Sequence, residues 1–169
     1  MRIGKIGVIG AGAMGSGIAA LAASAGFPVV LLDVPGDTDK NAAARNGVQR
    51  ALKGKPPQFM APDRAALITI ANTADDLMSL ADCDWIIEAI IEQPAPKRQL
   101  FEQLERVISP TAIVSTNTSA IPVRTLVESR TEPFRRRFLG THFFNPPRYL
   151  HLLEVIPTER TAPEVVAGG

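Results

Sequence analysis

The feature that most constrains the fold of this chain is a run of glycines near its N-terminus. Gly10, Gly12 and Gly15 stand in the spacing G-x-G-x-x-G, between an apolar run at 5–9 and a stretch of small residues at 13–25. The first segment predicts a strand buried on both faces, and the second predicts a helix. In such a turn the first glycine permits the tight bend, the second lets a pyrophosphate approach, and the third lets the helix pack on the strand. The sequence therefore predicts a site for the phosphates of a dinucleotide, at the positive end of a helix.

An acidic residue selects between the two nicotinamide dinucleotides. Asp33 closes the second strand-like run, 28–33, and lies 18 residues after Gly15. A carboxylate at this place accepts hydrogen bonds from the adenosine ribose hydroxyls and repels a 2′-phosphate. No arginine follows, since residues 34–36 are Val-Pro-Gly. The sequence predicts NAD rather than NADP as the cofactor; the alternative is that Asp33 only forms a turn.

The rest of the chain alternates between strand-like and helical segments. Further strands are predicted at 67–70, 85–91, 112–115, 138–144 and 150–156, and helices at 37–53, from Pro94 to about Ile108, at 122–128 and from Thr161 onward. This alternation is typical of an α/β fold in which helices cover both faces of a mostly parallel sheet. We therefore expect one Rossmann-type, doubly wound domain over residues 1–169.

The last residues predict that the sheet continues beyond this chain. The spacing Thr161-Ala-Pro-Glu164 is that of a capping box, which marks the start of a helix. About five residues follow Glu164, fewer than the roughly 12 at which even an isolated helix is marginal. We expect a fragment of a longer protein; the alternative is a short natural domain with a frayed end.

Composition narrows the setting and the partners. The formal net charge is +1 and the basic residues are spread along the chain, so nucleic acid is not expected as a partner. No apolar run reaches the roughly 18 residues that span a bilayer, and no cleavable signal segment is seen. The single cysteine, Cys83, excludes an internal disulfide framework, and it has no metal-ligand neighbour. We expect a cytoplasmic or organellar-matrix protein that is not secreted, without a metal site and with a buried thiol.

Polar residues follow two of the later strands, at the edge where open α/β sheets bind ligands. They are Thr116–Ser119 and Thr141–Asn145. Glu154 lies within a later apolar run, and a buried carboxylate needs a partner because an unpaired buried charge is costly. His142 is a natural partner, since a carboxylate holds the imidazole and raises its basicity. The alternative is a structural histidine with no part in catalysis.

Four phrases of the sequence, taken in order, resemble one enzyme family. They are G-A-G-A-M-G-S-G-I-A, W-I-I-E-A-I-I-E, S-T-N-T-S and T-H-F-F-N-P, followed by L-L-E-V. Together they resemble the NAD-binding domain of 3-hydroxyacyl-CoA dehydrogenases, over about residues 4–158. The resemblance implies oxidation of an (S)-3-hydroxyacyl-CoA to the 3-ketoacyl-CoA with NAD, as in fatty-acid β-oxidation.

The resemblance also implies residue roles. His142 would be the catalytic base, Glu154 its carboxylate partner, and Ser119 a contact of both the substrate and the nicotinamide side of the cofactor. The other implied cofactor contacts are Gly10, Ala11, Gly12, Ala13, Met14, Gly15, Asp33, Glu92, Lys97, Asn117 and Asn145.

The sequence departs from this family in what it carries beyond the cofactor site. The family's C-terminal helical domain, which closes over the acyl chain and forms the homodimer, is absent. The family also contacts CoA through Ser and Lys in a helical hairpin after the second strand, where this chain has Ala51 and the proline-broken stretch 53–57. An acyl-CoA thioester is therefore the expected substrate of the parent enzyme, without assigned CoA contacts, and this chain alone is expected to be weakly active or inactive.

Two rival functions remain open at this point. One is an NAD-linked dehydrogenase of the 3-hydroxyisobutyrate or 6-phosphogluconate kind, which uses a catalytic lysine in a later helix. The other is a nucleotide-binding module without catalysis. Three further positions have plain interpretations: Glu88 lies at the cofactor edge or pairs structurally, His151 faces solvent, and residues 135–137 form a solvated loop of arginines.

Overall fold

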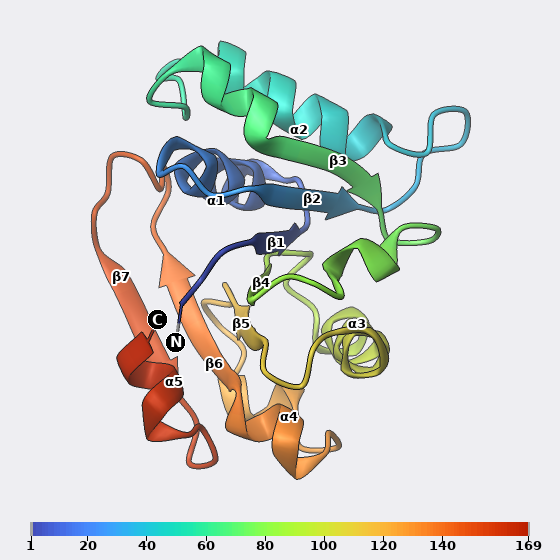
Figure 1. The fold of residues 1–169 in the computed structure, drawn as a ribbon, viewed down its shortest axis with the longest axis vertical. Coiled ribbons are helices and arrows are strands. Elements are labelled where there is room, and N and C mark those ends of the chain that lie inside the picture. Colours follow the sequence, from blue (N-terminus) through green and yellow to red (C-terminus); the bar gives the residue numbers. More distant parts are fainter. Residues whose placement is uncertain (1, 169) are drawn as a thin grey trace.

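The computed structural model describes residues 2–168 as one seven-stranded sheet with helices on both faces (Figure 1). The strands lie in the order β3-β2-β1-β4-β5-β6-β7; the first six are parallel, and β7 runs antiparallel to β6. Their bounds are β1 (Ile6–Ile9), β2 (Val29–Asp33), β3 (Ile68–Asn72), β4 (Trp85–Glu88), β5 (Ile113–Thr116), β6 (Phe138–Phe143) and β7 (Leu153–Pro157). This arrangement confirms the predicted Rossmann-type, mostly parallel sheet.

Helices cover both faces of the sheet, as parallel strands require. The α-helices are α1 (Ala13–Ser24), α2 (Ala42–Lys53), α3 (Pro94–Val107), α4 (Glu132–Arg136) and α5 (Pro163–Gly168), and the short 3₁₀ helices are η1 (Pro62–Leu67), η2 (Leu77–Leu80) and η3 (Val123–Leu126). One core layer joins α1 and α2 to β1 and β2, through residues such as Ile18 and Leu31. The other joins α3 and α4 to the centre of the sheet, where Phe101 and Phe138 meet edge to face at 5.0 Å.

The last strand differs most from its prediction. The run 150–156 was expected to be a buried strand, but β7 begins at Leu153 and all five of its residues are exposed. The side chains of Leu153, Val155 and Ile156 are 37%, 44% and 37% exposed. β7 is the edge strand of the sheet and pairs with β6 alone. Its apolar side chains therefore have a neighbouring strand on one flank only.

Smaller differences occur where elements end. The prediction of a solvated loop at 135–137 is wrong. Arg135 and Arg136 form the last turn of α4, and Arg137 Nε donates to the Ala112 carbonyl at 3.0 Å. The helix predicted from Asp37 begins only at Ala42. Other predictions hold: a helix follows the capping-box sequence, Cys83 is buried, and His151 is exposed. Within residues 2–168, no helix is both long and apolar enough to cross a membrane.

Candidate cofactor-binding and catalytic site

Parallel pairing brings the predicted site residues to a single edge of the sheet. Asp33, Glu88 and Thr116 are the last residues of β2, β4 and β5, Gly10 follows β1, and His142 lies one residue before the end of β6. β1 and β4 are neighbours in the sheet. After β1 the chain continues to β2 on one side of this pair, and β5 lies next to β4 on the other side. Open α/β sheets bind ligands at such a switch point, beyond the carboxyl ends of their strands.

The glycine turn has the geometry that its three positions predict. Gly10 adopts a φ of +100°, in the left-handed region that favours glycine. A Cβ atom on Gly15 would lie 1.7 Å from the Gly10 carbonyl oxygen. Helix α1 can therefore pack this closely on the turn only because residue 15 has no side chain. A Cβ on Gly12 would meet nothing within 4 Å, because that side of the turn is open. Gly12 and Ala13 are exposed at the start of α1, where the first N–H groups of a helix have no partner within it.

Asp33 holds this turn and lines the cleft beside it. Its Oδ2 accepts from the Ala11 N–H at 2.6 Å, and its Oδ1 accepts from the Val34 N–H at 2.7 Å. The cleft has a volume of about 560 Å³, within the roughly 300–1,000 Å³ typical of small-molecule sites. It runs past Gly12 and Asp33 to the loop after β4 and the first turns of α3. The cleft thus begins at the predicted ribose-binding carboxylate and continues toward the centre of the edge.

Helix α2 packs against the glycine turn at Ala11, a contact that the sequence did not predict. A Cβ on Gly47 would lie 2.7 Å from the Ala11 carbonyl oxygen, so only glycine allows this approach. One turn further along α2, Arg50 Nη2 donates to the same oxygen at 2.6 Å. A glycine on the buried face of an amphipathic helix was the only sequence signal for this contact.

His142 and Glu154 form the predicted pair. They are direct partners across β6 and β7, and His142 Nδ1 lies 2.8 Å from Glu154 Oε2. Glu154 is not buried as expected, since its side chain is 50% exposed against 20% for His142. The edge position of β7 explains this, because Glu154 pairs with the histidine while remaining in contact with water. Nearby, Asn117 Oδ1 accepts from the Phe143 N–H at 2.9 Å and ties the end of β5 to the residue after the histidine.

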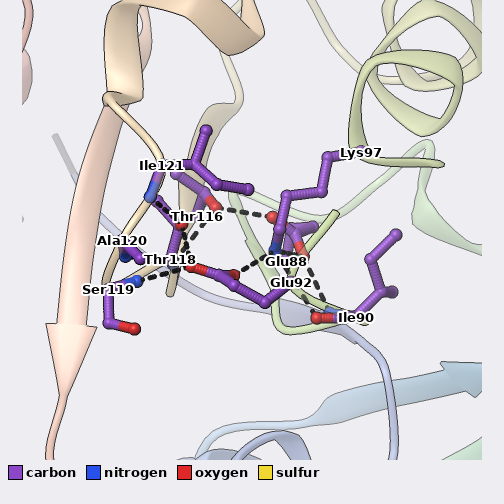
Figure 2. A network of polar contacts seen from close by, with 9 residues as sticks. All are labelled: Glu88, Ile90, Glu92, Lys97, Thr116, Thr118, Ser119, Ala120 and Ile121. Atoms are coloured by element: carbon purple, nitrogen blue, oxygen red, sulfur yellow. Dashed lines mark hydrogen bonds and ion pairs between the residues drawn. The ribbon is translucent and has the colours of Figure 1, made fainter. Parts of the chain in front are cut away.

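The loop that carries Ser119 is held by the carboxylate of Glu92, two residues before α3 (Figure 2). Glu92 Oε1 accepts from the Ser119 N–H at 2.9 Å, from the Ala120 N–H at 3.1 Å and from the Thr118 hydroxyl. Desolvation by burial raises the pKa of Glu92, but the bonds from Thr118, Ala120 and Ser119 and the charge of Lys97 outweigh it and bring the pKa to about 2. Glu92 is therefore ionised at neutral pH.

A buried ion pair lies directly beneath this loop. Glu88 is fully buried and Lys97 is 1% exposed, and Lys97 Nζ lies 2.6 Å from Glu88 Oε1 and 3.3 Å from Glu92 Oε2. Of the two interpretations of Glu88, both describe part of what the structure shows: it ends β4 at the carboxyl edge, and it pairs structurally with Lys97. Lys97, predicted as a cofactor contact, has its ammonium between the two carboxylates (Figure 2).

The remaining predicted residues lie around the same edge. Ser119 and Asn145 are exposed, in the loops after β5 and β6, and Met14 is half-buried in the first turn of α1. Thr116 and Thr118 were predicted to lie at this edge with Ser119, but the sequence indicated no role for either. Their hydroxyls bind Glu88 and Glu92.

The fold, the glycine turn and the acidic end of β2 define a Rossmann-type dinucleotide-binding domain. The family description "3-hydroxyacyl-CoA dehydrogenase, NAD binding domain" matches residues 5–168. The chain therefore belongs to the 3-hydroxyacyl-CoA dehydrogenase family, as its NAD-binding domain. This membership decides against the rival dehydrogenases of the 3-hydroxyisobutyrate or 6-phosphogluconate kind.

Individual relatives agree with this assignment. A probable 3-hydroxyacyl-CoA dehydrogenase of Deinococcus radiodurans is 56% identical over 168 residues, which are 98% of this chain and 49% of the relative. A putative fatty acid oxidation complex trifunctional enzyme of Rickettsia felis is 42% identical, over 98% of this chain and 23% of the relative. The crystal structure of 3-hydroxybutyryl-CoA dehydrogenase from Escherichia coli superposes with a TM-score of 0.82 at 32% identity, covering 99% of this chain and 35% of that one. The chain thus spans about half or less of the length of these relatives.

Proposed function

We propose that this chain is the cofactor-carrying part of an enzyme that oxidises (S)-3-hydroxyacyl-CoA to 3-ketoacyl-CoA, with His142 as the general base. The observation that carries the proposal is the 2.8 Å contact between His142 Nδ1 and Glu154 Oε2, on the same side of the sheet as the carboxyl ends of β1, β2 and β4. The relatives described above, a probable 3-hydroxyacyl-CoA dehydrogenase and a putative fatty acid oxidation complex trifunctional enzyme, support the substrate class and a role in β-oxidation.

The chain's residues fit an NAD molecule laid across the carboxyl edge. The open face of Gly12 and the free N–H groups at the start of α1 suit its phosphates, and Asp33 suits its adenosine ribose. Strand order then directs the nicotinamide end past β4 toward β5 and β6, where Ser119 and His142 lie. When bound, NAD supplies the hydride acceptor of the reaction.

The histidine pair supplies the proton acceptor. With Nδ1–H donating to Glu154, the lone pair of His142 is on Nε2, which takes the proton of the 3-hydroxyl as hydride leaves C3. Glu154 then stabilises the imidazolium that forms. In the reverse direction the imidazolium returns its proton to the oxygen on C3. General base catalysis of this kind contributes on the order of 10²–10⁴-fold.

Turnover of acetoacetyl-CoA and NADH by the full gene product, with and without His142→Gln, tests the proposal. Loss of the base predicts a fall in kcat of about 10²–10⁴-fold with unchanged affinity for NADH. His151→Gln is the matched control, because the chain has two histidines and this one is exposed and away from Glu154. Unchanged turnover of the His142→Gln enzyme would exclude His142 as the base, and absence of turnover by the wild-type gene product would favour a nucleotide-binding module without catalysis.

Substrate choice needs its own measurement. The full gene product is expected to oxidise 3-hydroxyacyl-CoA thioesters and to leave free 3-hydroxy acids untouched. A closing helical domain in that product is part of the same proposal and is supported by the length of the relatives; a homodimer is proposed with it. Preference for a free hydroxy acid would contradict the substrate class while leaving the NAD site standing.

A further inference from the structure

The buried carboxylate of Glu88 requires a physical explanation. It stands in the W-I-I-E strand with no exposed surface, and a charge taken out of water is costly unless it is paired and hydrogen-bonded. Both of its oxygens are satisfied: Oε1 accepts from Lys97 Nζ at 2.6 Å and from the Ile90 N–H at 2.7 Å, and Oε2 accepts from the Thr116 hydroxyl at 2.5 Å. Such a fully satisfied group is a rigid anchor for whatever it binds.

What Glu88 anchors is an ammonium that two carboxylates share. Lys97 Nζ is close to Glu88, at 2.6 Å, and more distant from Glu92, at 3.3 Å. The contact of Lys97 with Glu92 is to Oε2, whereas the loop after β5 binds Oε1 of the same carboxylate. The ammonium fixes the carboxylate of Glu92 without competing for the oxygen that holds Ser119 (Figure 2).

The carboxylate of Glu92 in turn sets the loop. Three donors converge on its Oε1, from Thr118, Ser119 and Ala120, and the Thr118 hydroxyl accepts from the Ile121 N–H at 3.2 Å. Ser119 itself is exposed, and its backbone N–H is held while its side chain is directed outward at the cofactor edge (Figure 2). The conformation of the loop therefore depends on where Glu92 stands.

We propose that Glu88 is a positioning residue for Ser119: through Lys97 it fixes Glu92, and Glu92 fixes the loop that presents the serine to the nicotinamide end of the cofactor. The inference rests on the proposed function for the role of Ser119, but the chain of contacts from Glu88 to the Ser119 N–H is independent of it. Without the charge of Glu88, Lys97 has Glu92 as its one remaining carboxylate, and it competes with the loop for that group.

The isosteric variant Glu88→Gln tests the proposal in two measurements on this chain. Amide hydrogen exchange reports the loop directly, and the Ser119 and Ala120 amides are expected to exchange about tenfold faster, as for one weakened bond to a charged group. Calorimetry reports the cofactor site, and the Kd for NAD is expected to rise by a similar factor of about ten.

A double-mutant cycle separates positioning from a general loss of structure. If Glu88 acts through Ser119, Glu88→Gln weakens NAD binding in the wild-type background and adds almost nothing in the Ser119→Ala background. The matched control is Glu105→Gln. Glu105 lies on α3, the helix of Lys97. It accepts from the backbone N–H and hydroxyl of Thr131 and pairs with Arg130, as Glu92 does with its loop and with Lys97, but away from the cofactor edge. Glu105→Gln is expected to leave the Kd for NAD and the exchange rate of the Ser119 amide unchanged.

The double variant Glu88→Gln/Lys97→Met covers the case in which the single variant does not fold. Removing both charges of a buried pair is often tolerated where removing one is not. By our proposal the double variant folds, and its Ser119 amide still exchanges faster because Glu92 has lost its ammonium. Unchanged exchange at Ser119 and Ala120 in whichever variant folds, or additive effects in the cycle, would overturn the proposal. Failure of the wild-type chain to bind NAD would instead refute the proposed function, and the exchange measurement would still decide the role of Glu88.

Discussion

At the scale of single residues, Gly12 separates folding from cofactor binding. Its φ of −63° is open to any residue, and a Cβ there would meet nothing within 4 Å. Gly12→Ala is therefore expected to change the free energy of unfolding by less than about 0.5 kcal/mol. The same methyl group would stand where the phosphates approach, so the affinity for NAD is expected to fall by about tenfold to a hundredfold, as for an overpacked contact. Calorimetry with NAD and urea unfolding measure the two effects.

Gly15→Ala is the counterpart of this variant. Its Cβ would lie 1.7 Å from the Gly10 carbonyl oxygen, so it is expected to lower stability as well as binding. If Gly12→Ala bound NAD as tightly as the wild-type chain, the phosphates could not lie on this turn.

Glu92 gives the site a defined response to acid. Its pKa is about 2 rather than the ordinary 4.5, because desolvation, which raises it, is outweighed by the bonds from the Ser119 loop and the charge of Lys97. A lowered carboxyl pKa stabilises the fold above the unfolded value, and this contribution is lost as the pH falls from about 4.5 to about 2. Urea unfolding of wild-type and Glu92→Gln chains between pH 6 and 3 should show the wild-type advantage shrinking as the pH falls below about 4.5. An advantage that is constant over this range would mean that Glu92 is not held as an anion.

At the scale of elements, the contact between α2 and the glycine turn has a testable consequence. Gly47→Ala would bring a Cβ to 2.7 Å from the Ala11 carbonyl oxygen and 2.8 Å from the Ala11 Cβ. Relieving this overlap costs about 1–3 kcal/mol, against a gain of about 1 kcal/mol in helix propensity. We expect a chain of equal or lower stability whose affinity for NAD is reduced, because the turn moves with Ala11.

Asn46→Ala is the control for this element. Asn46 is the preceding residue of α2 and is exposed, so the substitution changes helix propensity without touching the turn. It is expected to leave NAD binding unchanged. Equal NAD affinity of the Gly47→Ala and Asn46→Ala chains would show that α2 does not support the turn.

The sequence predicted the elements that repeat a local pattern and missed those set by their neighbours. The glycine turn and the end of β2 at Asp33 follow from spacing, and the structure shows both. The pairing of His142 with Glu154 was predicted because a buried carboxylate needs a partner; the structure shows the pair, although Glu154 is half exposed. The exposure of β7 does not follow from its apolar sequence, because it depends on the absence of a further neighbour among the described residues. The ion pair of Glu88 and Lys97 could not be predicted either. No local sequence pattern indicates that the end of a strand and the start of a helix bury opposite charges together.

At the scale of the whole molecule, the proposed catalytic pair and the strand beside it are open to water. Glu154 is 50% exposed, and the apolar side chains of β7 lie open to water. Holding the two reactants in register contributes about 7–11 kcal/mol to reactions of this kind, and water must be excluded for the fixed charges to act strongly. The described residues supply the proposed base His142, its carboxylate partner and the edge of the sheet beside the cleft, and this pair remains in contact with water.

We therefore expect the 169-residue chain to bind NAD and to show slow or no turnover. Calorimetry should give saturable binding of NAD and much weaker binding of NADP, since Asp33 repels a 2′-phosphate. Under the same conditions, consumption of NADH with acetoacetyl-CoA should be at most about a hundredth of that of the full gene product, a loss equivalent to only about 3 kcal/mol of the positioning term. The Asp33→Ala chain is the control for the first measurement, and it should lose the preference for NAD. Rapid turnover by the wild-type chain alone would show that the cleft and the His142–Glu154 pair hold the substrate without any covering element.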